Sequence, residues 1–109
     1  MTLYLFRFGY APEAWAALME NPQDRRDPLA SRVFGNFGGR LVGFWYAFGE
    51  HDGYALVELP DNVSAAAAAV AVSATGSFRS LDTTVLLTVE EMIAALEKAS
   101  DFAYVKPGA

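Results

Sequence analysis

Residues 41–59 read LVGFWYAFGEHDGYALVEL, and the architecture predicted for the chain rests on this stretch. Two apolar runs, residues 41–48 and 54–59, flank the polar cluster GEHDG, which contains the only histidine of the chain, His51. Apolar runs joined by a short glycine-rich link predict a β-hairpin, with a turn over residues 49–53 whose glycines supply positive φ. The first run is apolar or aromatic at every position, so we expect that strand to be covered on both faces.

The segment before the hairpin predicts one strand and a helical region interrupted by proline. Residues 3–8 (LYLFRF) form a short apolar run that is typical of a strand, and Pro12 suits the first turn of a helix. The helix should pause and then restart at either Asn21-Pro22 or Asp27-Pro28, because each pair places a capping side chain before a proline. The restarted helix ends at Gly38-Gly39, and its apolar face consists of Leu29, Val33, Phe34 and Phe37.

The segment after the hairpin predicts a helix without charge. Asp61 or Asn62 caps it, and VSAAAAAVAVSAT runs on to Gly76, which can adopt the left-handed conformation that ends helices. Residues 62–78 contain no charged side chain, whereas a surface helix normally shows a polar stripe. We therefore expect this helix to lie between the sheet and another body; the alternative is that its alanines are simply exposed.

A last strand and a last helix complete the pattern. The strand lies within residues 78–87, and Thr88 with Glu91 forms a capping box at the start of the helix. The apolar face of that helix consists of Val89, Met92, Ile93, Leu96 and Ala99. Residues 100–109 form a short tail whose apolar side chains could pack on the domain: Phe102, Tyr104 and Val105.

The order β-α-β-β-α-β with an added C-terminal helix predicts one domain over residues 1–109, of the α+β class. It is typical of a ferredoxin-like antiparallel sheet, with strand order 4-1-3-2 and helices on one face. Hydrophobic residues make up 53% of the chain and charged residues 19%, which is more apolar than an ordinary soluble domain. We therefore expect the uncovered face of the sheet to pack on the same face of a second copy, as a dimeric α+β barrel.

Several stretches together resemble the GYD domain family, small bacterial proteins named for a Gly-x-Tyr-Asp-type motif. They are FGEHDG, PDNVSAAAAAVAVSATG and a strand ending LLTVEE, joined by the aromatic first strand, APEAW and ENPQDRR. The resemblance covers nearly the whole chain and implies a ferredoxin-like, oligomeric domain without an established activity. The chain departs from the family pattern at His51, where tyrosine is common, and at Pro28, which interrupts a usually continuous helical stretch.

Composition argues against several classes of partner and compartment. The formal net charge is −5 and the basic residues are scattered, so a nucleic-acid partner is not expected. No run reaches the length of a membrane span, and the N-terminus lacks the basic and apolar regions of a signal peptide. There is no cysteine, which is easiest to reconcile with a cytoplasmic protein.

Two groups of polar residues are candidates for chemistry. The predicted topology brings Arg7, Tyr10, His51, Asp52 and Arg79 to one rim of the sheet. There the arginines could hold an anion and His51 could move a proton; alternatively Asp52 stabilises the turn and the other side chains are solvated. Glu58 and Asp82 interrupt apolar strands, so each could act as a base with a raised pKa inside a closed barrel or could simply mark a strand end or edge.

Aromatic residues of the hairpin are candidates for ligand binding. Trp45, Tyr46 and Tyr54, with Phe44, would line the space between two sheets if they face a second copy, where they hold a flat apolar ligand or fill the interface. We expect no metal and no cofactor, because no ligand pair such as H-x-x-x-H occurs; haem bound through His51 is the alternative.

Two functions remain open from the sequence. The first is a homo-oligomeric binding or assembly module, with the chain itself as partner and a small apolar or anionic ligand in a pocket between sheets. The second is a cofactor-free oxygenase, isomerase or lyase acting on a small hydrophobic acid. In that enzyme Glu58, His51 or Asp82 would be the base, and Arg7 or Arg79 would hold the anion.

Overall fold

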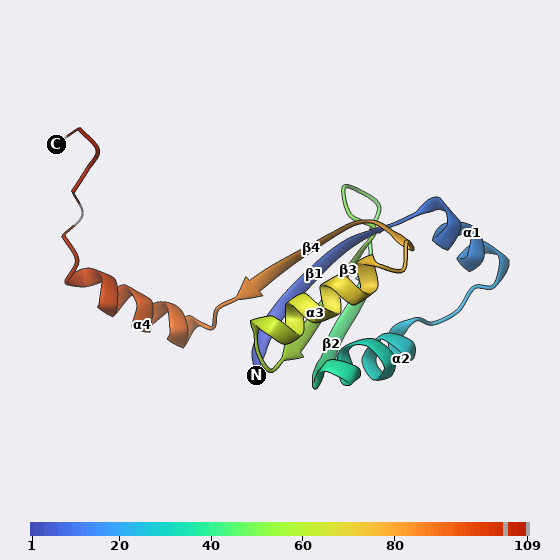
Figure 1. Ribbon diagram of the computed structural model, residues 1–109, viewed down its shortest axis with the longest axis horizontal. Coiled ribbons are helices and arrows are strands. Elements are labelled where there is room, and N and C mark those ends of the chain that lie inside the picture. Colours follow the sequence, from blue (N-terminus) through green and yellow to red (C-terminus); the bar gives the residue numbers. More distant parts are fainter. Residues whose placement is uncertain (104, 109) are drawn as a thin grey trace.

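The computed structural model describes residues 1–103 and 105–108 and contains a four-stranded sheet with helices packed on one face (Figure 1). The strands are β1 (Thr2–Tyr10), β2 (Arg40–Tyr46), β3 (Gly53–Leu59) and β4 (Phe78–Leu86). They lie in the order β2-β3-β1-β4, and every neighbouring pair is antiparallel. The α+β class and the ferredoxin-like strand order are thereby confirmed, whereas the dimeric barrel stays a prediction.

The helices follow the predicted order along the chain. They are α1 (Pro12–Glu20), α2 (Arg26–Pro28), α3 (Asn62–Ser73) and α4 (Val89–Ser100). α2 continues directly into a π-helical segment, η1 (Leu29–Phe34), and a 3₁₀ turn, η2 (Gly35–Phe37). Gly38 then adopts a φ of 76°, so this helical region ends at the predicted glycine pair because only glycine takes that conformation without strain.

The helical restart corrects one sequence expectation. The helix begins again at Arg26, next to the predicted Asp27-Pro28, but neither Asn21 nor Asp27 caps it. Instead a carboxylate oxygen of Asp24 accepts the backbone N–H of Arg26 at 2.9 Å, and the same carboxylate pairs with the Arg26 guanidinium at 2.6 Å. Asp24 therefore satisfies the first free donor of the helix.

The hydrophobic core lies between the sheet and the helices. Alternate residues of β1 and β3, such as Tyr4, Phe6 and Val57, point into it and are almost completely buried. Phe34 of η1 and the alanines of α3 cover them, and the partly buried residues packed there include the predicted Leu29, Val33 and Phe37. The Tyr4 hydroxyl donates to Asn62 Oδ1 at 2.7 Å, which ties the start of α3 to the central strand.

The hairpin forms as predicted, but its glycines act differently. β2 and β3 are joined by residues 47–52, and the Ala47 N–H donates to the Asp52 carbonyl at 2.8 Å. The prediction that Gly49 and Gly53 supply positive φ is wrong, because among the described residues only Gly38, Gly76 and Gly108 do so. Gly53 is required for a different reason: a Cβ there would collide with the ring of Phe8.

α3 packs closely on the sheet through its smallest side chains. Asp61 caps it, accepting the Ser64 N–H at 2.8 Å, and Gly76 ends the turn that follows with a φ of 75°. Ala65 and Ala68 are buried against the core, whereas Val63 and Val70 on the other side are exposed. Within the described chain, nothing covers that outer side, so the expected second body remains a prediction.

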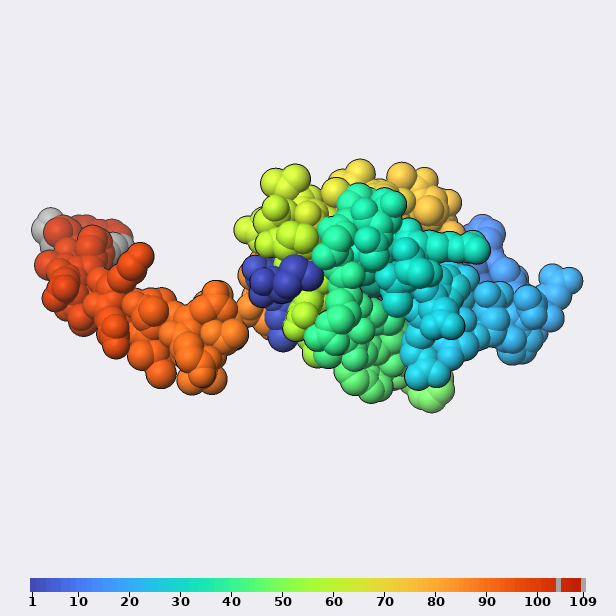
Figure 2. Space-filling model, turned by 90° about the horizontal axis from the view of Figure 1, so that it is seen from below, coloured from blue at the N-terminus to red at the C-terminus, as the bar shows by residue number. Residues whose placement is uncertain are grey.

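α4 stands away from the rest of the molecule. Its capping box is present, with Thr88 Oγ1 accepting the Glu91 N–H and Glu91 Oε1 accepting the Thr88 N–H, both at 3.0 Å. Every residue from 87 to 100 is exposed, and Figure 2 shows this part, coloured orange to red, projecting from the body. The chain consequently measures 60 × 33 × 23 Å. In the tail Phe102 and Val105 are exposed, and Tyr104 lies outside the described residues.

The second face of the sheet carries no helix among the described residues. We call this the helix-free face. Strand residues that alternate with the core residues point to the helix-free face, and two residues paired directly across strands lie on the same face. Leu5 pairs with Leu56 and with Thr84, and Leu3 pairs with Leu86. These four leucines are only half-buried. The face is thus apolar at its centre and open to a partner.

Candidate functional site

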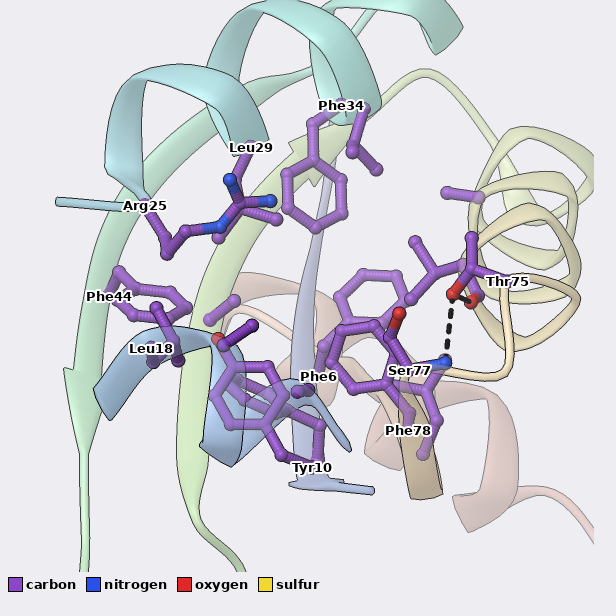
Figure 3. Close-up of a pocket in the computed structure, with 18 of the residues that line it drawn as sticks. Phe6, Tyr10, Leu18, Arg25, Leu29, Phe34, Phe44, Thr75, Ser77 and Phe78 are labelled. Atoms are coloured by element: carbon purple, nitrogen blue, oxygen red, sulfur yellow. Dashed lines mark hydrogen bonds between the residues drawn. The ribbon is translucent and has the colours of Figure 1, made fainter. Parts of the chain in front are cut away.

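An apolar cavity of about 330 Å³ lies between the helix-covered face of the sheet and the helices (Figure 3). Side chains from all four strands, α1, η1 and α3 line it, together with the connection between α1 and α2. A volume of a few hundred Å³ with mostly apolar walls is typical of small-molecule sites. Its aromatic walls are Phe6, Phe8, Tyr10, Phe34, Phe44 and Phe78.

The aromatic walls support one another. Phe8 stacks on Phe44 with ring centroids 5.7 Å apart, and it meets Tyr10 and Phe78 edge-on at 5.0 and 5.5 Å. Phe6 similarly contacts Phe34 at 5.4 Å. Such offset and edge-to-face contacts stabilise ring positions beyond burial alone. The aromatic side chains that bound the cavity therefore stabilise one another's positions.

Arg25 contributes the positive charge of the cavity. It lies in the connection between α1 and α2, is half-buried, and extends in Figure 3 toward Phe34. Its Nη1 donates to Gln23 Oε1 at 3.3 Å, a neutral partner. None of the salt bridges among the described residues includes Arg25, because the nearby Asp24 is paired with Arg26. The positive charge of Arg25 is therefore available to pair with an anion in the cavity.

Tyr10 brings a protonated hydroxyl to the same cavity. Its Oη lies 3.4 Å from Tyr46 Oη, and burial raises the pKa of Tyr10 well above the ordinary value for tyrosine. The contact with Tyr46 raises that pKa further, whereas the positive charge of Arg25 acts in the opposite direction. Tyr10 is therefore a neutral phenol and a hydrogen-bond donor at physiological pH.

The predicted rim forms in part, around Asp52. Asp52 Oδ2 accepts the Tyr10 N–H at 2.9 Å and lies 3.4 Å from Arg79 Nη2, while the Asp52 N–H donates to the Phe8 carbonyl at 2.8 Å. Arg79 also donates to the Glu50 carbonyl at 3.4 Å. These bonds fasten the hairpin to the end of β1, which agrees with the structural reading of Asp52.

Arg7 and His51 both lie near Tyr54, which points to the helix-free face. Arg7 is on the helix-free face, directly opposite Tyr54, and its Nη2 donates to Thr84 Oγ1 at 3.1 Å. The His51 ring meets Tyr54 edge-on at 5.9 Å. Arg7 Nε and His51 Nδ1 are buried, and neither has a hydrogen-bond partner among the described residues. The Arg79 guanidinium lies against Gly9, on the same side of β1 as Arg7, so the expectation that the two arginines hold one anion together stays a prediction.

The three residues predicted as bases do not meet. Glu58 pairs with Arg40 at 3.1 Å and lies opposite Leu3, whereas Asp82 is exposed and lies opposite Arg7, so they are at different ends of β1. His51 is in the hairpin connection. Each residue remains a candidate, but no two of them form a shared acid and base pair.

The predicted aromatic ligand residues divide between the two faces. Trp45 pairs with Tyr54, so both lie on the helix-free face, where they could meet a second copy. Phe44 and Tyr46 pair with Ala55 and Gly53 and point toward the helices. A pocket between two sheets requires a second copy and stays a prediction.

Sequence reasoning missed the cavity residues on the helix side. Arg25 and Phe78 were not singled out, because one lies in a polar connection and the other at the start of a strand. The signal that was available is the charged stretch ENPQDRR, which interrupts an otherwise apolar helical region. It shows no spacing that would identify Arg25 as the residue facing inward.

No metal or haem site is evident among the residues that the structure describes. No three His, Asp or Glu side chains gather there in a way that could hold a metal ion. His51 does not line the helix-side cavity, and haem bound through His51 stays an untested alternative.

Fold and cavity together define a ferredoxin-like α+β domain with a site of small-molecule size. The family model of the GYD domain matches residues 4–96, and the chain belongs to the GYD domain family. Among curated proteins, none matches this chain. Within the described part, no helix combines the length and apolar character needed to cross a membrane.

Proposed function

We propose that this GYD-domain protein is a homo-oligomeric binding module. Two copies pack their helix-free faces and α4 helices together, and each chain keeps a small-molecule cavity on its helix-covered side. The observation that carries this proposal is α4, whose apolar residues are about half exposed or more: Met92 45%, Ile93 50%, Leu96 61% and Val89 72%. An apolar stripe on a helix needs a partner surface, and the described chain gives it none.

The length of α4 supports the same conclusion. It has 12 residues, and isolated helices of that size are marginal in water even with good caps. Its capping box supplies only part of the missing stabilisation. Docking on a second copy would bury the stripe and stabilise the helix at the same time.

The helix-free face is suited to meet a copy of itself. Its charged residues include both signs, with Arg7, Arg40 and the Arg79 guanidinium over Gly9 on one side and Glu58 and Asp82 on the other. In a two-fold interface a residue on one copy can face a different residue on the other, so opposite charges can meet across it. Its centre is formed by half-buried leucines, which is the apolar core that stable interfaces need.

The test is the mass of the protein in solution, measured by light scattering after size exclusion at micromolar concentration. We expect a dimer or larger assembly for the native chain. Leu56→Asp places a charge on the helix-free face and should shift the protein to monomer. Val70→Asp is the matched control, because Val70 is exposed on α3 and should leave the mass unchanged.

A native chain that stays monomeric over this range would contradict the association. So would a Leu56→Asp protein that remains folded by circular dichroism and keeps the native mass. Equal loss of association in both variants would place the interface elsewhere and would also refute the proposed geometry.

A further inference from the structure

We infer that the helix-side cavity binds an aromatic carboxylic acid, with the carboxylate held by Arg25 and the ring lying among the phenylalanines. This inference rests on the proposed binding role of the cavity. It does not depend on self-association, because one chain supplies all the lining residues. The ligand is thereby defined as a flat apolar body with a single negative charge at one end.

The negative charge of the proposed ligand follows from the surroundings of the Arg25 guanidinium. A half-buried guanidinium loses part of its hydration, and this loss is normally offset by a carboxylate partner. Among the described residues, the hydrogen-bond partner of the Arg25 guanidinium is the neutral Gln23 amide, and the carboxylate of Asp24 is held by Arg26 at 2.6 Å. A planar guanidinium binds a carboxylate through two parallel hydrogen bonds, so a carboxylic acid suits it better than a simple anion.

The aromatic part of the proposed ligand follows from the side chains that line the cavity. Six aromatic side chains line a volume of about 330 Å³, and the ring of Phe8 already stacks on Phe44 and meets Phe78 edge-on. A flat ring can extend this arrangement, since aromatic pairs favour offset stacking and edge contacts. The buried hydroxyl of Tyr10, which stays protonated, offers a further donor to an acceptor atom of the ligand.

The test compares two ligands of the same shape by titration calorimetry on the full chain. The probes are 2-naphthoate and 2-naphthalenemethanol, which share the ring system and differ in charge. A charge-assisted hydrogen bond should make the native protein bind the acid at least about tenfold more tightly than the alcohol. Arg25→Met should remove this preference while alcohol binding changes little.

Arg32→Met is the matched control, because it removes the same charge from an exposed arginine of η1 that does not line the cavity. It should keep the preference for the acid. If Arg25→Met does not fold, amide chemical shifts of the native protein provide the second measurement. The acid should then perturb Phe6, Phe34 and Ala68, and leave Leu3 and Leu86 on the helix-free face unchanged.

Equal affinity for acid and alcohol in the native protein would overturn the role of Arg25, and absence of binding by both would overturn the cavity as their site. Shifts confined to the helix-free face would also overturn it. Light scattering on the same samples separates the two proposals. A monomer that prefers the acid refutes only the association, and a dimer that binds neither probe refutes only the ligand site.

Discussion

The helices α3 and α4 have the same length, 12 residues, but their sequences and surroundings are opposite. α3 has no charged residue and little difference between its faces, yet it packs firmly on the sheet through Ala65 and Ala68. α4 has a clear apolar stripe and charged residues on its other side, yet every one of its residues is exposed.

The difference shows that an apolar stripe on a helix does not by itself mean that the helix packs on its own chain. Small side chains let the backbone of α3 approach the strands closely, so a helix without a marked stripe still buries two positions. The stripe of α4 indicates only that some surface should cover it. It does not say whether that surface belongs to the same chain, and here the described chain does not supply it.

The largest expected effect comes from placing a charge on the packed side of α3. Ala65→Asp puts an unpaired carboxylate into the core, and we expect a loss of about 3–5 kcal/mol in the free energy of unfolding. Ala66→Asp, on the exposed side of the same helix, should cost far less. Urea unfolding followed by circular dichroism measures both. Similar losses for the two variants would mean that α3 is not oriented as described.

The same kind of substitution in α4 should act on assembly and not on folding. Ile93→Asp interrupts the apolar stripe, so the dissociation constant of the assembly should rise at least about tenfold. The free energy of unfolding of the monomer should change little, because the hydrophobic core described above includes no residue of α4. Ala94→Asp lies on the opposite side of α4 and serves as the control in analytical ultracentrifugation. A loss of domain stability with Ile93→Asp would show that α4 docks on its own chain.

The smallest expected effect concerns the two helix caps and their response to pH. The hydrogen bond from the Ser64 N–H lowers the pKa of Asp61 in the folded state. Asp61 therefore contributes stability above its unfolded pKa, and this contribution is lost as pH falls through its folded pKa. Asp61→Asn keeps a good cap without the titration, so its melting temperature should fall less on acidification than that of the native chain.

The cap of α4 provides the contrast. Thr88→Ala should lower the helical signal of α4 and leave the melting of the sheet nearly unchanged, because Thr88 is uncharged and α4 is separate from the core. A pH response of Asp61→Asn identical to that of the native chain would contradict the role assigned to Asp61. Calorimetric melting over acidic to neutral pH measures these effects.

Elements and their order could be predicted because their signals are local. The apolar run of β1, the cap at Asp61 and the capping box at Thr88 each involve residues close in sequence, and all three are confirmed. The cap before Pro28 was misplaced because several polar residues there could serve, and only the actual path of the chain selects Asp24. The roles of Gly49 and Gly53 were wrong because the connection is longer than a tight turn.

The candidate site was predicted less well, because it depends on side-chain direction. Tyr10, Asp52 and Arg79 were brought together correctly, since the ends of β1 and β4 and the hairpin must meet at one edge. Arg7 lies on the face of the sheet away from Tyr10, because strand residues alternate between faces, so the predicted rim residues are divided between the two faces. The register shift between Leu41 and Gly43 also affects which aromatic residues of β2 face the helices.

The elements, their order and the antiparallel sheet follow from the amino-acid sequence alone, because periodicity, caps and glycine positions act between residues near one another in the chain. The packing in three dimensions was needed to show that α4 stands away from the sheet and that Arg25 faces an aromatic cavity with no carboxylate partner among the described residues. Both depend on which distant surfaces meet, and on the space that remains between packed side chains.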